Sequence, residues 1–272
     1  MILLKKIKSF IVKLWGLLRL PEMLILPGNL AFYLILSLAP IITLFGIIAS
    51  SFSLSVTSIT NFLSDFLPRG VTDLILPLLD GSGLSAGNFI FVIIMFFIAS
   101  NGADSLIIAA NTLYDCDDSN YLFRKVKSLF LIFWILVLFL VILILMAFGS
   151  FILTKILTVG VVGKFIVNNY ILLTGIKVIL AFFITFVVIK IVYTLAPSFK
   201  LKSKYVNVGA MFATLAIMIV SSIYSFYVTN IAHYDIIYGG LANIAILMLL
   251  VYFISYIIVL GMAINKNYYN VE

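Results

Sequence analysis

The sequence predicts an all-α, polytopic membrane protein. We expect a helical bundle with about six transmembrane helices, an N-terminal amphipathic interfacial helix and short amphipathic helices in the first outer loop. Of the 272 residues, 64% are hydrophobic and only 10% are charged, whereas a soluble domain has about 25% charged residues. The apolar runs are continuous and long enough for spans of about 20 residues. A membrane barrel would instead show alternating segments of about 10 residues.

Residues 1–20 are predicted to form an amphipathic helix that lies in the membrane interface. Apolar side chains occupy one side of its helical wheel, and basic side chains occupy the other. The basic side is expected to contact anionic lipid headgroups through Lys5, Lys6, Lys8, Lys13 and Arg19. Because Lys13 and Arg19 interrupt the apolar stretch, this segment does not match a signal peptide. Pro21 is expected to end the helix.

The transmembrane domain is predicted to cover residues 21–266, followed by a cytoplasmic tail over 267–272. Its spans are expected at about 30–50, 88–113, 128–153, 170–195, 206–228 and 239–264. Pro40 lies in the middle of the first span, where a proline removes a backbone hydrogen bond and favours a kink. Between the first two spans, apolar residues repeat at helical spacing over 59–67 and 71–79, which predicts two short amphipathic helices.

The distribution of positive charge predicts the orientation of the bundle. Lysine and arginine concentrate in cytoplasmic loops of membrane proteins. With six spans, most of the 17 basic residues fall on the same side as the N-terminus, whereas Arg69, Lys155 and Lys164 fall on the opposite side. We therefore expect a protein of the cytoplasmic membrane with both termini in the cytoplasm. The net charge of +7 is then explained by topology and anionic lipid, so nucleic acid is not an expected partner.

A polar interruption in the second span gives the candidate functional residues. Asn101 and Asp104 belong to it, Asn111 lies about two helical turns further on, and Lys177 lies within the fourth span. Ionisable residues at membrane depth are costly and mark a function or a buried pair. One hypothesis is a polar substrate path, with Asp104 paired to a lysine. The other is an interhelical polar contact, with Lys177 and Lys190 extending to the membrane interfaces.

The remaining residues indicate neither an enzyme nor a cofactor or metal site. One cysteine, Cys116, excludes an intramolecular disulfide, and one histidine, His233, cannot build a zinc site alone. No phosphate-binding loop, paired-histidine helix or nucleophile with an evident base is present. Small residues such as Gly209 and Gly261 are expected to allow close helix packing.

Several segments together resemble the YihY/BrkB family of bacterial inner-membrane proteins. The first is Asn29–Pro40, and the second is Asn111–Tyr114 followed by Arg124 and Lys125. The C-terminal half matches over Pro197–Ala210, which ends in Gly209-Ala210, and over Tyr238–Leu241 and Leu260–Asn265. The family commonly has a Leu-Trp pair where this chain has Leu250-Val251, a difference expected to affect packing. The resemblance covers residues 20–265 and implies about six spans and a poorly defined, transport-related role.

Three functions are compared on this basis. The first is a transporter of a small solute, ion or lipid, motivated by the polar interruption at 101–104 and by Pro40. The alternative is a non-transporting membrane scaffold or envelope assembly factor, in which the basic segments recruit partners. Family members have also been labelled ribonucleases, but no constellation for hydrolysis supports that activity here. The sequence indicates neither the substrate nor the oligomeric state.

Overall fold

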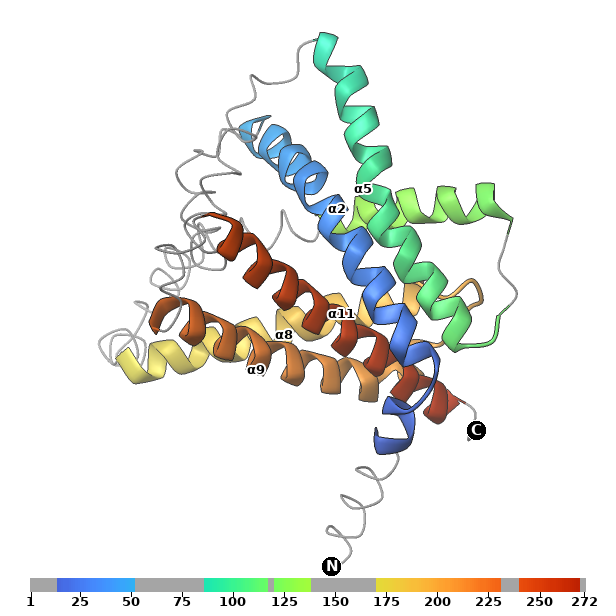
Figure 1. The fold of residues 1–272 in the computed structure, drawn as a ribbon, viewed down its shortest axis with the longest axis vertical. Helices are drawn as coiled ribbons and strands as arrows, with labels where there is room; N and C mark the ends of the chain where they lie inside the picture. The colour runs from blue at the N-terminus through green and yellow to red at the C-terminus, as the bar shows by residue number, and fades with distance from the viewer. Residues whose placement is uncertain (1–13, 52–85, 117–119, 138–169, 231–239, 270–272) are drawn as a thin grey trace, which may run out of the picture.

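The computed structural model describes residues 14–51, 86–116, 120–137, 170–230 and 240–269, and every regular element there is helical (Figure 1). A short helix over 14–18 precedes the first long one, and a helix over 121–137 follows α5. The labelled elements are α2 (Glu22–Ser51), α5 (Ala86–Leu113), α8 (Tyr170–Leu195), the 3₁₀ helix η1 (Ser203–Val206), α9 (Asn207–Asn230) and α11 (Gly240–Tyr269).

Five of these helices are long and apolar enough to cross a membrane, so the chain is a multi-pass membrane protein. The candidate spans are Glu22–Leu44, Val92–Leu113, Val178–Leu195, Ser203–Tyr227 and Ile244–Lys266. The helix over 121–137 contains the start of the predicted third span, and the rest of that span lies outside the described residues. The predicted outer-loop helices also lie outside them, as do Lys5, Lys6, Lys8, Lys13 and His233.

The first span begins earlier than the sequence pattern predicts. The predicted start was near residue 30, but α2 starts at Glu22 and continues through both Pro27 and Pro40. A proline inside a helix removes one backbone hydrogen bond. The protein tolerates this loss because packing against neighbouring helices can offset it. Both prolines are buried against the bundle.

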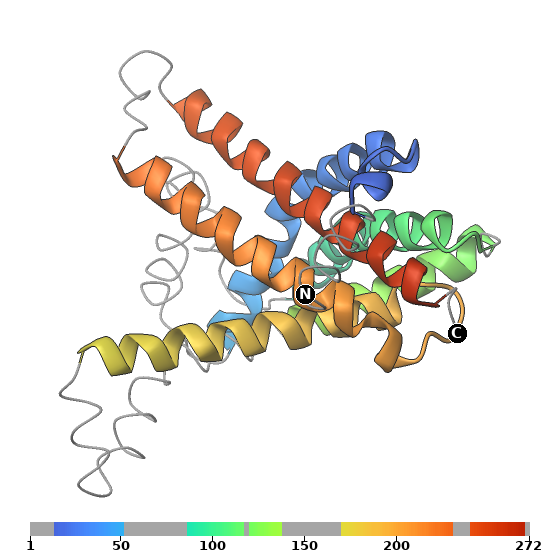
Figure 2. The same ribbon diagram turned by 90° about the horizontal axis from the view of Figure 1, so that it is seen from below.

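The long helices pack in the order α5, α2, α11, α9 and α8, with α11 in the centre. At one end of the bundle α5, α8 and α11 finish while α2 and α9 begin, and we call this the basic end because Arg124, Lys125, Lys127 and Lys266 lie there. In Figure 2, α8, α9 and α11 lie close together at this end and spread apart toward the other.

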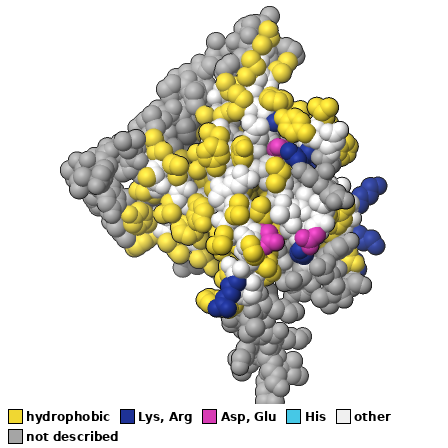
Figure 3. All heavy atoms as spheres, turned by 45° about the vertical axis from the view of Figure 1, so that its right-hand side comes forward, with side chains coloured by type: hydrophobic (Ala, Val, Ile, Leu, Met, Phe, Trp, Pro, Cys, Tyr) yellow, Lys and Arg dark blue, Asp and Glu magenta, His cyan; other side chains and the backbone are white. Residues whose placement is uncertain are grey.

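Apolar side chains cover most of the described surface in Figure 3, and charged side chains gather toward the basic end. On α9 the exposed apolar residues recur every three or four positions, at Met211, Leu215, Ile219, Ile223 and Phe226. This spacing gives one continuous stripe along the helix. A stripe of large apolar side chains facing outward is the pattern of a helix in contact with lipid.

The α2–α5 crossing is built around one serine and one glycine. Ser37 is fully buried, and its hydroxyl accepts a hydrogen bond from the backbone N–H of Gly102 at 3.0 Å. A Cβ atom at Gly102 would lie 3.0 Å from Ser37 Oγ and 3.2 Å from Leu34 Cδ2. The small residue therefore sets the close approach of the two helices.

A second close contact joins α9 to α11 and α8. The backbone N–H of Gly209, in the first turn of α9, donates to Asn265 Oδ1 on α11 at 2.7 Å. Helix N-termini have N–H groups without partners inside the helix, so Asn265 caps α9. Tyr193 of α8 donates its hydroxyl to the carbonyl oxygen of Ile258 at 2.8 Å, and it packs against Gly261.

Replacing Gly209 with alanine is expected to destabilise the protein. The new Cβ would collide with the backbone carbonyl oxygen of Gly261 and with the Asn265 side chain, and backbone cannot give way as a flexible side chain can. Overpacking of this kind costs about 1–3 kcal/mol, which lowers the thermal midpoint by roughly 2–4 °C per kcal/mol. Thermal unfolding in detergent measures the shift.

Gly28→Ala is the matched control, because nothing lies within 4 Å of a Cβ placed at that helical position. It should be neutral or stabilising by about 0.4–1 kcal/mol. Equal midpoints for the two variants would contradict the assigned packing.

Candidate functional site

Asp104 of α5 forms an ion pair with Arg124, which lies near the start of the helix over 121–137. The guanidinium Nε donates to Asp104 Oδ1 at 2.9 Å, and the two side chains are only 14% and 16% exposed. Arg124 also lies over the ring of Tyr121, 5.7 Å from its centroid. Removing one partner of such a buried pair leaves an uncompensated charge. The pair therefore fastens the two helices to each other.

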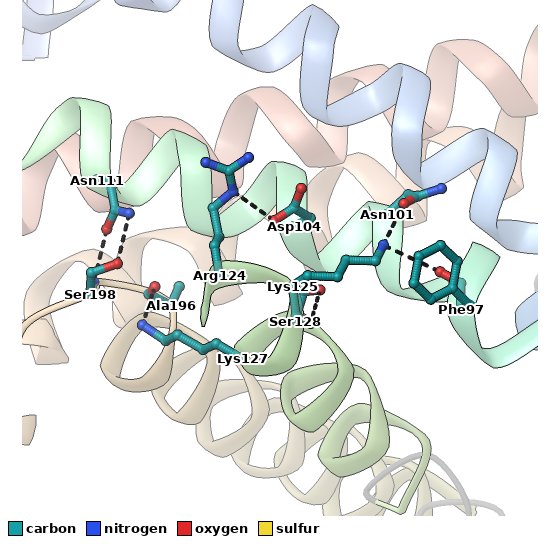
Figure 4. Close-up of polar contacts among 10 residues, drawn as sticks. All are labelled: Phe97, Asn101, Asp104, Asn111, Arg124, Lys125, Lys127, Ser128, Ala196 and Ser198. Atoms are coloured by element: carbon teal, nitrogen blue, oxygen red, sulfur yellow. Dashed lines mark hydrogen bonds and ion pairs between the residues drawn. The ribbon is translucent and has the colours of Figure 1, made fainter. Parts of the chain in front are cut away.

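Lys125 extends to the same face of α5, where its ammonium group meets neutral acceptors (Figure 4). Nζ donates to Asn101 Oδ1 at 2.7 Å and to the carbonyl oxygen of Phe97 at 3.4 Å. It also lies 4.2 Å from the centroid of the Phe97 ring, within the range of a cation–π interaction. The residue is 6% exposed, which is unusual for lysine.

Lys127 holds the end of α8. Its ammonium group donates to the carbonyl oxygen of Ala196 at 2.9 Å and also to that of Pro197. Carbonyl groups at a helix C-terminus lack hydrogen-bond donors inside the helix and carry partial negative charge. A lysine there supplies a donor and also a positive charge. Burial lowers the pKa values of Lys125 and Lys127, which precede the predicted span that begins at residue 128.

Asn111 joins α5 to the turn after α8. Its Nδ2 donates to Ser198 Oγ at 2.8 Å, and its Oδ1 accepts the backbone N–H of Ser198 at 2.8 Å. Next to this contact, the rings of Tyr114 and Phe199 meet edge to face with centroids 5.6 Å apart. Burial raises the pKa of Tyr114. The segment after α8 is thus fixed from two sides, by Asn111 and by Lys127.

The helix over 121–137 has opposite faces that suit these contacts. Leu122, Val126 and Phe130, four residues apart, are exposed. Lys125 and Ser128 are buried on the opposite face, where Ser128 Oγ donates to the carbonyl oxygen of Lys125 at 2.8 Å. An apolar surface outward and polar residues inward is the expected pattern for a helix beside lipid.

Other charged groups at the basic end are more exposed. Lys266 in the last turn of α11 pairs with Asp115, whose side chain is 73% exposed. Asp115 follows α5 and has φ 52°, an uncommon backbone conformation that aspartate tolerates better than most residues. Arg19 is exposed and lies over the ring of Trp15, 5.2 Å from its centroid.

The structure places three of the predicted site residues, Asn101, Asp104 and Asn111, on α5 and gives each a partner from another element. The carboxylate of Asp104 pairs with an arginine instead of the lysine considered from the sequence. Lys177 lies in α8, and its side chain is outside the described residues.

Sequence reasoning missed the partner residues Arg124, Lys125 and Lys127, because all three count as ordinary loop charges when topology is assigned. Their signal is the spacing with which Leu122, Val126 and Phe130 form an apolar stripe opposite Lys125. In a bilayer such a stripe faces lipid, and the lysine then faces protein. The position of these charges relative to the apolar stripe therefore indicates whether they face protein or belong to a loop.

The site holds three cationic side chains through hydrogen bonds and one ion pair. Arg124, Lys125 and Lys127, which we call the basic latch, connect the start of one helix to α5 and to the end of α8. Each contact can break without covalent chemistry. Within the parts of the chain that the structure describes, no three His, Cys, Asp or Glu side chains gather closely enough to hold a metal ion.

Asp104→Ala is expected to lower stability far more than Lys266→Ala. The first change leaves Arg124 buried without its carboxylate, which costs about 3–5 kcal/mol. The second removes an exposed pair, which contributes about 0–1 kcal/mol. Thermal unfolding of both variants in the same detergent measures the difference, and similar losses would show that the Asp104–Arg124 pair is not buried as described.

Comparison with known proteins places the chain in a family. Residues 22–271 match the model of the virulence factor BrkB family. The relative named ribonuclease-like protein YfkH, from Bacillus subtilis strain 168, is 27% identical over 94% of both chains. A UPF0761 membrane protein of Alteromonas mediterranea is 44% identical over 26% of this chain and 24% of its own.

A second UPF0761 membrane protein, from Pasteurella multocida strain Pm70, is 28% identical over 32% of this chain and 28% of its own. No solved structure matches the chain. Segments that carry the family resemblance meet in the fold: Gly209 contacts Asn265, Asn111 contacts Ser198, and Arg124 and Lys125 contact α5. The chain belongs to the virulence factor BrkB family of membrane proteins.

Proposed function

We propose that this protein transports a small solute, ion or lipid, and that the basic latch is the gate at the basic end of the bundle. The observation that carries the proposal is a set of one buried and two half-buried cations, in which Arg124 and Lys125 hold α5 while Lys127 holds the end of α8. Charged residues at membrane depth usually face a bundle interior or a path for a substrate.

The geometry supports a gate because the latch joins α5 to the turn after α8, which Asn111 and the Tyr114–Phe199 ring contact also connect. In the described residues α5 packs mainly on α2, while α8 packs on α9 and η1. The start of the helix over 121–137 contacts both α5 and the turn after α8. A movement of this one segment would break its contacts with both α5 and the turn after α8 together, which leaves the Asn111–Ser198 contact as the remaining connection.

The proposed orientation places the basic end in the cytoplasm. The charges counted there favour that side by the positive-inside rule. The latch uses Arg124, Lys125 and Lys127 for internal contacts. The exposed residues Lys200 and Lys202 remain to face headgroups or solvent. This end therefore still has exposed positive charge when the three latch residues are not counted, so the proposed orientation does not change.

A weakened latch is expected to increase the passive flux of small solutes. In proteoliposomes loaded with a panel of labelled cations, anions, amino acids and lipids, Asp104→Ala should raise the flux of the transported solute by about tenfold. A change of 1–3 kcal/mol in the equilibrium between two states corresponds to roughly 5–150-fold. Initial rates at equal protein density measure the effect.

Lys266→Ala is the control for this assay, since its partner Asp115 is mostly exposed and the pair lies outside the latch. It should move solutes at the wild-type rate. If wild type and Asp104→Ala behave alike on every solute that moves, the assigned gate is wrong.

A scaffold or envelope assembly role is the second candidate, favoured by the loop between α8 and α9. There Leu201 is buried, while Lys200 and Lys202 on either side of it are exposed. These lysines could recruit an acidic partner or anionic lipid. Crosslinking in the native membrane should then recover a stoichiometric protein partner, and recovery of lipid alone would count against this role.

The name of YfkH as a ribonuclease-like protein is not carried over to this chain. We propose that this protein is not an enzyme. The described acidic residue of the site, Asp104, is held by Arg124, whereas hydrolysis needs convergent catalytic groups. Any RNA-degrading activity in a purified sample should therefore be the same for wild type and Asp104→Ala. It should disappear when contaminating nucleases are removed.

A further inference from the structure

We propose that Asn101 and Phe97 form a binding site for a primary alkylammonium group, which the side chain of Lys125 fills in this structure. The site consists of Asn101 Oδ1, the carbonyl oxygen of Phe97 and the Phe97 ring. The inference deepens the proposed transport function, because it gives the chemical class of the substrate that the gate would admit.

The chemistry of the site selects an organic monovalent cation. Its two oxygen atoms are neutral, and its third element is an aromatic face. An ammonium group has three donors for such oxygens and binds an aromatic face through a cation–π interaction. Mg²⁺ and Ca²⁺ take six or more oxygen ligands, usually including carboxylates, which this set lacks. Burial lowers the pKa of Lys125, and the nearby Asp104 carboxylate offsets part of this lowering.

Both acceptors belong to α5, so the site does not depend on the element that supplies Lys125. Phe97 and Asn101 are one helical turn apart and share one face of the helix. Ser100 Oγ also donates to the Phe97 carbonyl at 2.7 Å. The Phe97 carbonyl is therefore fixed within α5 and the Asn101 side chain extends from the same helix, while the cation comes from a separate helix. Without the Lys125 ammonium group, Asn101 Oδ1 and the Phe97 ring would be available to another ammonium group, while the Phe97 carbonyl would still accept the Ser100 hydroxyl.

The length of the lysine side chain defines a suitable probe. Replacing Lys125 with alanine removes three carbon atoms and the terminal nitrogen, and the removed fragment corresponds to n-propylammonium. The surroundings already accommodate this fragment as part of the lysine, which is buried along its length. A cavity left by truncation can bind a ligand of the same shape.

The test is chemical rescue of the full-length Lys125→Ala variant in detergent. Its thermal midpoint should be below that of the wild type, and millimolar n-propylammonium chloride should raise it by roughly 2–4 °C, as expected for a ligand that binds only the folded state. Potassium chloride, tetramethylammonium chloride and 1-propanol at equal concentration should leave the midpoint unchanged. If the variant fails to fold alone, n-propylammonium present during purification should restore monodisperse protein.

Two further variants make the test specific. Lys127→Ala is the matched control, because it removes a latch lysine but leaves Lys125 on its acceptors, and it should show no response to n-propylammonium. Lys125→Ala combined with Asn101→Ala should also lose the response. The proposal is overturned if n-propylammonium has no effect on Lys125→Ala, if potassium or 1-propanol is equally effective, or if the response survives the loss of Asn101.

Transport is measured separately, as uptake of labelled n-propylammonium by wild-type proteoliposomes. Rescue with uptake supports both proposals. Rescue without movement of any solute supports the site and contradicts the transport function. Movement of other solutes without rescue supports the transport function and contradicts the alkylammonium site.

Discussion

A cation buried beside hydrocarbon must find hydrogen-bond acceptors or an opposite charge, because its desolvation is otherwise costly. The start of the helix over 121–137 brings Arg124 and Lys125 into that situation, and α5 supplies what they need. Asp104 provides the carboxylate for Arg124 at 2.9 Å, and Asn101 provides the amide oxygen for Lys125 at 2.7 Å. Arg124 and Lys125 therefore explain why the second span contains polar residues at Asn101 and Asp104.

The same constraint connects the rest of the bundle at this end. Lys127 satisfies the carbonyl groups at the end of α8, Asn111 holds the following turn, and Asn265 caps the start of α9. The Lys127 and Asn265 contacts pair backbone groups at a helix terminus with a side chain from another helix, and Asn111 binds the backbone N–H and hydroxyl of Ser198 in the turn after α8. Beside these polar contacts, the helices also approach closely through small residues such as Gly102. One end is thus polar and closely joined, while the spans spread apart toward the other.

The fold class follows from the sequence because the length and hydropathy of a span are local properties. The five candidate spans come from apolar runs that can be recognised without knowledge of their neighbours. The start of the first span differs from the prediction, because α2 begins at Glu22 and contains Pro27 as well as Pro40, and packing against neighbouring helices can offset the lost backbone hydrogen bonds. Asp104 and Asn101 could be selected as costly residues within an apolar segment. Their partners could not be selected, because Arg124 and Lys125 are distant in sequence from them and resemble ordinary loop charges.

The coupling between α5 and the basic latch holds this end of the bundle together, and a double-mutant cycle measures that coupling most directly. The free energies of unfolding of wild type, Asp104→Ala, Arg124→Ala and the double variant give the interaction free energy of the pair. A buried pair predicts a coupling of about 1–3 kcal/mol, so that the double variant loses less stability than the two single changes together. Additive losses, with a coupling near zero, would contradict the claim that this pair fastens the two helices.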